Sequence, residues 1–436
     1  ITNIGIGYYA GYHNVTGTQN TWLGYQAGSG ASGQSNSSNV GIGYQALTYV
    51  TTGGSNVAIG YATGDSITSG ARNVAVGQSA LGALTTGTNN VVLGVSAMSS
   101  ADGLERENVA IGYYAGGGVN NDSAIRNVFI GEYAGYGGTG ALNYSIAIGY
   151  QALDATGDSA DAAGAVAIGY QALTSNYDGQ YNTAIGYNAL TSNKRNDHNT
   201  AVGYRALFAM SASSAGTTGN TAVGSWVGDS LTTGTHNTLM GFYAGQALTT
   251  PHSNTMVGSQ AGYNTTTGAY NIVLGNEALY QNVLGSYNTA IGHKAGQYAT
   301  GSYNTYIGFN SGQGASNSAP YSSANSNTGV GTYTMQLITT GGNNTALGYG
   351  AINKNSTGTN IVAIGASAGY YATGSSNTFV GSYAGQGGTT SAPFSSGTSN
   401  VAVGYYAMRV FTTGYSNTVM GVNAGDAITS GYENAI

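Results

Sequence analysis

One short motif, usually an asparagine followed by a β-branched, a small and an aliphatic residue and then a glycine, occurs in 24 copies in the 436 residues of this chain. Successive copies are usually 17 residues apart, so the glycine recurs at Gly7, Gly24, Gly43, Gly60 and Gly77 and onward along the chain. A fixed period of this size is the signature of a repeat array, in which each copy is one structural unit. The chain is therefore expected to form stacked copies of one small unit instead of several globular domains.

Each position of the repeat accepts few residue types, and we number the positions from the asparagine, so that the glycine is position 5. Position 1 is Asn in 21 of 24 copies, and the exceptions are Ser145, Ala165 and Ile361. Position 2 is always Val, Ile or Thr, and position 4 is always Ile, Val, Leu or Met. Because β-branched residues pack well on a pleated surface and glycines at positions 5 and 15 are turn signals, positions 1 to 5 are expected to form a short strand.

Seventeen residues hold two short strands and two turns, which make one coil of a parallel β-solenoid. The predicted fold is all-β: a parallel β-solenoid or β-roll of about 24 short coils, with a period of about 17, in a single continuous array over residues 1–436. Stacked coils repeat at about 4.8 Å, the spacing of neighbouring strands. Equal positions then form ladders along the stack, as Asn amides do in cross-β assemblies. The ladder residues of one repeat are Asn182, Ile185, Gly186 and Ala189.

Position 15, which is usually glycine, indicates a turn with positive φ. Asn196 occupies this position in one coil and would tolerate such a turn. Pro251 occupies it in another coil, and its ring holds φ near −65°. The coil that contains Pro251 is therefore expected to turn differently.

The strand carries apolar residues on both of its faces. Side chains alternate along a strand, and we expect positions 2 and 4 to line the coil interior and position 3 to point outward. Position 3 is small and apolar, as in Ala58 and Ala184, or bulky, as in Trp22 and Phe129, and no Asp, Glu, Lys or Arg occurs in positions 1 to 5. A strand that is apolar on both faces is buried on both. We therefore expect position 3 to meet other copies of the chain, intertwined or packed in register as a homotrimeric fibre.

Composition excludes several classes of protein. Charged residues are 6% of the chain and the net charge is −6, without a basic stripe that would bind nucleic acid. The absence of cysteine excludes disulfides and Cys-ligated metals. No apolar run approaches the roughly 20 residues that span a bilayer, so no membrane insertion is expected. The chain starts at Ile1 and stops at Ile436 within a repeat, without atypical capping repeats, and we expect it to be a segment of a longer fibre.

The run from Asn182 to Leu190, NTAIGYNAL, resembles the shaft repeats of phage tail-fibre proteins, including those that end in an intramolecular chaperone domain. The VAIG runs that begin at Val57 and Val166 are similar to head repeats of trimeric autotransporter adhesins. The resemblance covers nearly the whole chain. It implies a homotrimeric, extracellular attachment fibre on a virion tail or a cell surface. The longer period and the many tyrosines depart from the adhesin pattern, and the sequence shows neither a chaperone domain nor a membrane anchor, so a bacterial surface adhesin or extracellular filament stays open as an alternative.

Few residues point to chemistry. Asp154, Asp158 and Asp161 lie in a Gly-rich stretch and could ligate Ca²⁺. We favour an exposed polar insertion instead, because the calcium-binding nonapeptide of other β-rolls is absent. The five histidines are scattered without metal-ligand spacing, and no nucleophile elbow or phosphate-binding loop occurs. We expect no catalytic site, no cofactor and no resident metal.

Aromatic residues are the candidates for binding. Eleven of the 36 tyrosines follow the glycine directly, at position 6, where they form either a structural stacked ladder or an exposed strip that grips sugar rings. Two similar insertions, at 318–323 and 391–396, lie 73 residues apart, which indicates a duplicated block of four coils. Tyr321 and Phe394 each follow a proline in these insertions and are the candidate receptor contacts. The alternative is that both loops only pack on the neighbouring coil.

Three classes of function fit such an array. The first is an attachment fibre, whose partners are copies of itself and a cell-surface glycan. The second is an ice-binding solenoid, which needs an outward, regular threonine array, and threonine fills position 2 in half of the copies. The third is a polysaccharide-degrading enzyme, which needs paired carboxylates in a cleft, whereas the carboxylates here are few and dispersed. We expect the first of these.

Overall fold

The chain folds into short parallel strands joined by turns, and no helix occurs in the part that the structure describes. This computed structural model describes residues 2–120, 124–137, 142–155, 163–211, 216–314, 321–388 and 394–436. Two compact units, Ile1–Gly219 and Asn220–Ile436, divide the chain. Each unit is a parallel β-solenoid with a period of about 17 residues, and about 23 turns are present in all, which confirms the predicted fold class. One continuous array over residues 1–436 stays a prediction.

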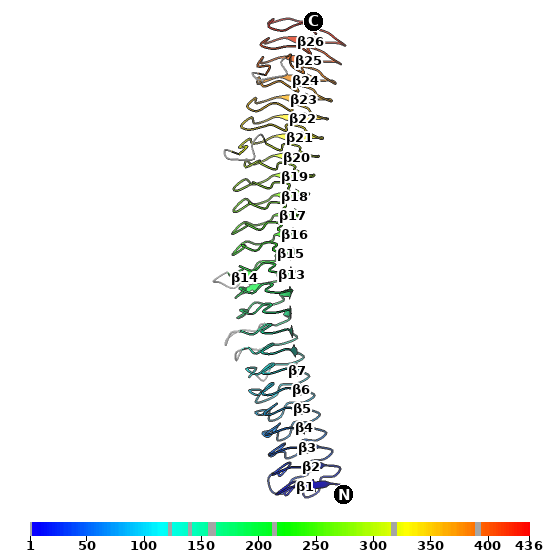
Figure 1. The fold of residues 1–436 in the computed structure, drawn as a ribbon, viewed down its shortest axis with the longest axis vertical. Helices are drawn as coiled ribbons and strands as arrows, with labels where there is room; N and C mark the ends of the chain where they lie inside the picture. The colour runs from blue at the N-terminus through cyan, green and yellow to red at the C-terminus, as the bar shows by residue number, and fades with distance from the viewer. Residues whose placement is uncertain are drawn as a thin grey trace. The chain divides into compact units, whose positions relative to one another are not determined.

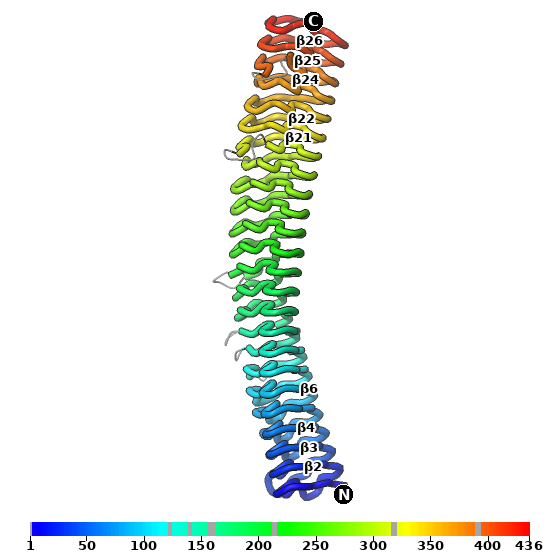
Figure 2. The backbone as a smooth tube through the Cα atoms, in the orientation of Figure 1, coloured from blue at the N-terminus to red at the C-terminus, as the bar shows by residue number. Residues whose placement is uncertain are grey.

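Each coil contributes one three-residue strand to the stack of its unit, as Figure 1 shows, and Figure 2 traces the path of the coils. The strands of the first unit are β1 (Ile4–Ile6), β2 (Thr21–Leu23), β3 (Val40–Ile42), β4 (Val57–Ile59), β5 (Val74–Val76), β6 (Val91–Leu93), β7 (Val109–Ile111), β8 (Val128–Ile130), β9 (Ile146–Ile148), β10 (Val166–Ile168), β11 (Thr183–Ile185) and β13 (Thr200–Val202), with a separate pair of two-residue strands, β12 (Asn196–Asp197) and β14 (Gly216–Thr217).

The second unit has the same construction. Its strands are β15 (Thr221–Val223), β16 (Thr238–Met240), β17 (Thr255–Val257), β18 (Ile272–Leu274), β19 (Thr289–Ile291), β20 (Thr305–Ile307), β21 (Thr328–Val330), β22 (Thr345–Leu347), β23 (Val362–Ile364), β24 (Thr378–Val380), β25 (Val401–Val403) and β26 (Thr418–Met420). Within each unit successive strands pair in parallel with equal repeat positions opposite each other; Ala167, for example, pairs with Ala184. The 17-residue period of the sequence therefore sets the register of the sheet.

The middle residue of each strand points into the coil, so the predicted face assignment is wrong. From β2 onward position 3 is buried in every three-residue strand, whereas positions 2 and 4 are half-buried or exposed. Ala184 is fully buried and Ile185 is 37% exposed. The interior is narrow, and it is filled from the opposite wall by residues such as Ala46, Leu47 and Val50, at positions 8, 9 and 12. A small position 3 lets the two walls approach, so this position needs no second chain to bury it.

Bulky residues at position 3 fit because glycine replaces the large residue at position 9. The ring of Phe129 occupies the space that a Cβ would need at Gly135 in its own coil and at Gly116 in the coil before. The other three aromatic residues at position 3 have the same pair of glycines: Trp22 with Gly11 and Gly28, Tyr306 with Gly296 and Gly312, and Phe379 with Gly369 and Gly385. Where position 3 is alanine, as at Ala184, Leu190 can fill position 9. The alternation of glycine and large aliphatic residues at position 9 thus compensates for the size of position 3.

Buried asparagines at position 1 hold neighbouring coils together. The Oδ1 of Asn182 accepts from the backbone N–H of Asn199 (2.9 Å), and its Nδ2 donates to the carbonyl of Asn196 (2.7 Å), which closes its own coil. Both Asn182 and Asn199 are fully buried. One side chain therefore satisfies backbone groups of two coils. Gly186 and Ala189 of the same repeat also lie within the stack: the carbonyl of Gly203 leaves no room for a Cβ at Gly186, and Ala189 is buried.

Glycine is used at positions 5 and 15 for different reasons. At position 5, φ lies between +126° and +145°, a region open in practice only to glycine. At position 15 φ is not positive, and glycine is used because the backbone of the next coil lies close: a Cβ on Gly70 would be 2.7 Å from the carbonyl oxygen of Gly87. Pro251 fits this position, and its carbonyl accepts from Nδ2 of Asn237 at 2.9 Å. The expectation of a different turn at Pro251 is therefore wrong, because the position never required positive φ.

Candidate functional site

Positions 2 and 4 form an uncharged outward surface on each unit, which we call the outward strand face. It has one row of β-branched residues and one row of aliphatic residues or methionine. In the second unit nine of the twelve residues of the first row are threonine, and three, Ile272, Val362 and Val401, are aliphatic. Leu347 of the second row is 48% exposed. A regular row of exposed aliphatic side chains is typical of a contact surface.

The tyrosines at position 6 stack along the coils. Rings of Tyr25 and Tyr44 lie 5.1 Å apart, and those of Tyr44 and Tyr61 lie 5.0 Å apart, in nearly parallel planes. A second run contains Tyr150, Tyr170, Tyr187 and Tyr204. The edges of these rings are exposed. The predicted stacking is present, and its use for sugar binding stays a prediction.

Tyr321 and Phe394 pack on the coil that precedes each of them, while residues 318–320 and 391–393 lie outside the described residues. Tyr321 stacks on Tyr298, with 6.4 Å between ring centroids, and Phe394 stacks on Tyr371 at 5.9 Å. Both candidate rings are half-buried. All four rings obey the 73-residue offset, as the duplicated block requires. This packing is what the structural alternative predicts, and a receptor contact through the exposed part of each ring stays a prediction.

The acidic cluster is only partly within the described residues, because Asp158 and Asp161 lie outside them. Asp154 is half-buried, and this burial raises the pKa of its carboxyl. Among the described residues no group of His, Cys, Asp or Glu could hold a metal ion. Over the same ranges there is no helix with the length and apolarity needed to cross a membrane.

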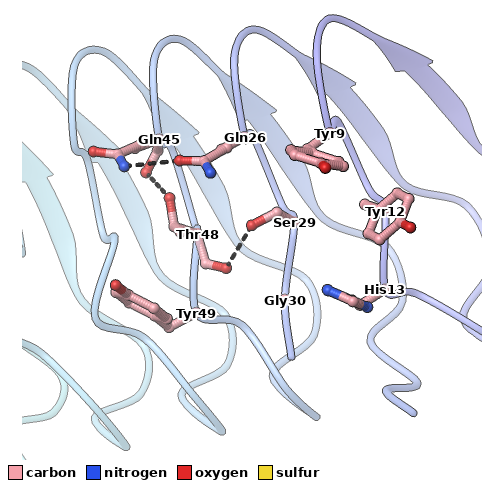
Figure 3. A pocket seen from close by; sticks show the side chains of 9 residues that line it. All are labelled: Tyr9, Tyr12, His13, Gln26, Ser29, Gly30, Gln45, Thr48 and Tyr49. Carbon is pink, nitrogen blue, oxygen red and sulfur yellow. Dashed lines mark hydrogen bonds between the residues drawn. The ribbon is translucent and has the colours of Figure 1, made fainter. Parts of the chain in front are cut away.

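A notch in the side of the first three coils was not predicted from the sequence. It encloses about 320 Å³ and opens at positions 7, 10 and 11 of the repeat (Figure 3). Its lining consists of Tyr9, Tyr12, His13, Gln26, Ser29, Gly30, Gln45, Thr48 and Tyr49. None of these is Asp, Glu, Lys or Arg. The notch is therefore an aromatic and polar surface without a fixed charge.

Small residues in the second coil create the notch. Positions 10 and 11 are Tyr12 and His13 in the first coil, but Ser29 and Gly30 in the second, and Tyr49 fills position 11 in the third. Figure 3 shows the rings of the first and third coils on opposite sides of the gap over Ser29 and Gly30. The N–H of Gly30 donates to the carbonyl of Thr48 (2.8 Å), so the main chain continues its ladder beneath the gap. A comparison of positions 10 and 11 between successive coils would have revealed the notch from the sequence.

Two glutamine amides at position 7 form one wall of the notch. Nε2 of Gln45 donates to Oε1 of Gln26 at 2.9 Å, and Oγ1 of Thr48 donates to the Gln45 carbonyl at 2.7 Å. The hydroxyl of Ser29 donates to the carbonyl of Thr48 at 3.4 Å. Nε2 of Gln26 has no hydrogen bond within the described ranges, so a donor beside the notch is available to a ligand.

A smaller hollow of about 190 Å³ in the second unit arises in a similar way. Gly350 lies at position 7 between Tyr333 of the coil before and Tyr370 of the coil after, and Asn353 lies beside it. Nδ2 of Asn353 donates to the carbonyl of Tyr333 at 2.8 Å. A small residue between aromatic rungs is thus a recurring source of hollows in this fold.

Comparison with known proteins adds no family to this description. No protein-family model matches the chain, and no curated protein matches it. A function for the chain is therefore inferred from its repeat and from the surfaces described above.

Proposed function

We propose that this chain is a structural, non-enzymatic shaft of an extracellular attachment fibre, a phage or phage-like tail fibre that binds a host surface. The observation that carries this proposal is the commitment of positions 1, 3, 5 and 8 of the repeat to the stacking of the coils. Asparagine bridges coils, positions 3 and 8 fill the interior, and glycine permits close backbone approach. The loops are left to vary on a rigid support, which is where binding residues are usually found.

The resemblance to tail-fibre shaft repeats favours a virion over a bacterial surface adhesin or filament as the location. Antibodies raised against residues 1–436 test this by immunogold electron microscopy of the source culture. We expect label on the tails of phage-like particles. Label on filaments of intact cells would support the adhesin alternative, and label confined to the cell interior would contradict both.

Self-association as a homotrimer is part of the proposal, with a reason that differs from the one drawn from the sequence. Position 3 is buried within its own coil, so it cannot supply the interface. The outward strand face supplies an uncharged surface that repeats along each unit instead, and burial of such a surface favours association. The number three comes from the resemblance to trimeric fibres.

A second candidate, binding to a regular lattice such as ice, is favoured by one observation. Position 2 points outward, so the threonine row of the second unit, with Thr289, Thr305 and Thr328 on successive strands, is an outward regular array. Freezing hysteresis of the purified chain tests this candidate. Thr305→Tyr interrupts the threonine row. Hysteresis of the parent chain that disappears in this variant would favour lattice binding over the fibre. Absence of hysteresis in the parent chain would exclude lattice binding.

We propose that this chain is not an enzyme. Incubation of the purified chain with bacterial surface polysaccharides should release no reducing ends. Release that persists after repurification would contradict a purely structural role.

A further inference from the structure

We infer that the notch over Ser29 and Gly30 is a binding site for one ring of a neutral saccharide. The inference goes beyond the proposed function, because it assigns a ligand to a site that a purely structural shaft does not need. It depends on the side chains of the first three coils alone. It therefore holds or fails independently of where the fibre is located and how many copies associate.

The spacing of the coils fits one ring between two aromatic walls. Tyr12 and His13 of the first coil and Tyr49 of the third are separated by two coil spacings, or roughly 9.6 Å. A ring that contacts a wall on each side needs roughly 7 to 8 Å, twice the optimal separation of carbon atoms. The volume of about 320 Å³ lies at the small end of ligand pockets, which run from roughly 300 to 1,000 Å³. The notch is thus suited to one ring, with its neighbours in a chain outside.

The chemistry of the walls matches a saccharide. The C–H face of a sugar ring is apolar and packs on the face of an aromatic ring such as Tyr49, which is large and keeps its hydroxyl in water. Sugar hydroxyls both donate and accept hydrogen bonds. Nε2 of Gln26 can donate to one of these hydroxyls, while the bond between the amides of Gln45 and Gln26 (2.9 Å) holds the Gln26 side chain in place.

The absence of charge selects neutral ligands. An anionic sugar or a phosphate would need Lys or Arg for a strong contact, and neither occurs in the lining. A cationic ligand finds no carboxylate there. A planar nucleobase is the other neutral ring that could enter, so the experiment includes a nucleoside as a comparator.

Two substitutions and one matched control test the site. Ser29→Tyr fills the notch with a residue that the fold already accepts at position 10, as in Tyr12 and Tyr136. Tyr49→Ser removes one wall, and because this ring is 60% exposed the change should leave the melting temperature unaltered. Tyr177→Ser removes another exposed tyrosine of the same unit, away from the notch, and serves as the control.

Saturation-transfer NMR on residues 1–436 measures binding of methyl α-D-mannoside, methyl β-D-galactoside and N-acetylglucosamine, with glucuronate and adenosine as comparators. We expect at least one neutral saccharide to bind saturably, with Kd on the order of 1 mM, as for a small ligand with few contacts. Its affinity should fall at least tenfold in Ser29→Tyr and in Tyr49→Ser and stay the same in Tyr177→Ser.

Three results would overturn the inference: no binding of any neutral saccharide, binding that Ser29→Tyr and Tyr49→Ser leave unchanged, or tighter binding of glucuronate or adenosine. If Ser29→Tyr fails to fold, Tyr49→Ser alone decides between the outcomes. If immunogold labels fibres but no saccharide binds at the notch, this inference fails and the proposed function stands. The failure of the inference can therefore be told apart from the failure of the proposed function.

Discussion

At the scale of single residues, this fold buries many polar side chains and satisfies them through the stack. Asn237 shows the pattern: its Oδ1 accepts from the backbone N–H of Asn254 at 3.0 Å, and its Nδ2 donates to the carbonyl of Pro251 at 2.9 Å. A buried backbone group without a partner costs about 1–3 kcal/mol. Position 1 is therefore determined by the hydrogen bonds of two coils. The recurrence of Asn predicted an amide ladder along the stack but not these bonds to the backbone.

Asn237→Ala should lower the stability of its unit by about 2 kcal/mol or more, because the N–H of Asn254 and the carbonyl of Pro251 both lose their partner. Asn276→Ala, at an exposed asparagine, should change stability by less than about 0.5 kcal/mol. Urea denaturation, monitored by hydrogen exchange, measures the stability of both variants. Equal effects of the two substitutions would show that the ladder does not stabilise the coils.

Glu105 is one of the buried residues whose side chain is not fully satisfied. It is fully buried at the position that usually carries glycine, its Oε2 accepts from the N–H of Gly103 at 2.9 Å, and its Oε1 has no partner among the described residues. Burial raises the pKa of this carboxyl above its ordinary value. The folded state then holds the proton more tightly than the unfolded chain, so stability falls as pH rises from the ordinary pKa of about 4.3 through the raised folded pKa, and stays lower above it.

Glu105→Gln should therefore stabilise the first unit at pH 7 and flatten the decline of its unfolding free energy above about pH 4.3. The glutamine Oε1 can still accept from Gly103. Thermal melts of both proteins from pH 3 to pH 8 measure the difference. A variant that is less stable than the parent at pH 7 would show that the carboxylate has a favourable partner.

At the scale of the coil, the sequence was sufficient for the period, the strand and the ladders, but not for the inside and outside of the strand. The alternation of side chains along a strand separates its two faces but does not say which face is buried, and here both faces are apolar. The size of Phe129 together with the glycines at Gly116 and Gly135 is the sequence signal that places position 3 inside. The notch could not come from the repeat itself, because it depends on how Ser29 and Gly30 differ from their neighbours in the stack.

Ala184 and Ile185 test the corrected assignment directly. Ala184→Lys places an unpaired charge in the coil interior and should destabilise the first unit by several kcal/mol. Ile185→Lys, at a position that is 37% exposed, should change stability by less than about 1 kcal/mol. Thermal melts of the two variants check this. The opposite order would restore the assignment that the sequence first indicated.

Phe129 and Gly135 should be energetically coupled. Phe129→Ala alone leaves a cavity and should cost about 3–5 kcal/mol. Gly135→Leu alone places a side chain where the ring lies and should also destabilise. The double substitution recreates the pair Ala147 and Leu153 of the next coil, where Leu153 already adopts a φ of 54°.

A double-mutant cycle measures this coupling by denaturation. The double variant should be more stable than the sum of the single changes predicts by about 0.5–3 kcal/mol, the range for residues in contact. Additive effects would show that positions 3 and 9 do not share one space.

At the scale of the whole molecule, we propose that each coil closes its own core and that copies of the chain associate through the outward strand face. A variant with Thr238→Lys, Thr328→Lys and Thr418→Lys places charges on exposed threonines of that face, on strands that are not neighbours.

A control variant carries the same three charges at exposed serines just before position 1, where arginine already occurs at Arg72 and Arg126. Its substitutions are Ser253→Lys, Ser326→Lys and Ser399→Lys. Both variants add the same charge, so a difference between them reports on the face alone.

Sedimentation velocity of the parent chain and both variants, with circular dichroism melts of the same samples, tests the central claim most directly. We expect a trimer for the parent and the control, and a folded monomer with an unchanged melting temperature for the variant of the outward strand face. A parent chain that sediments as a stable folded monomer would contradict association. A face variant that unfolds when it dissociates would contradict the claim that each coil closes its own core.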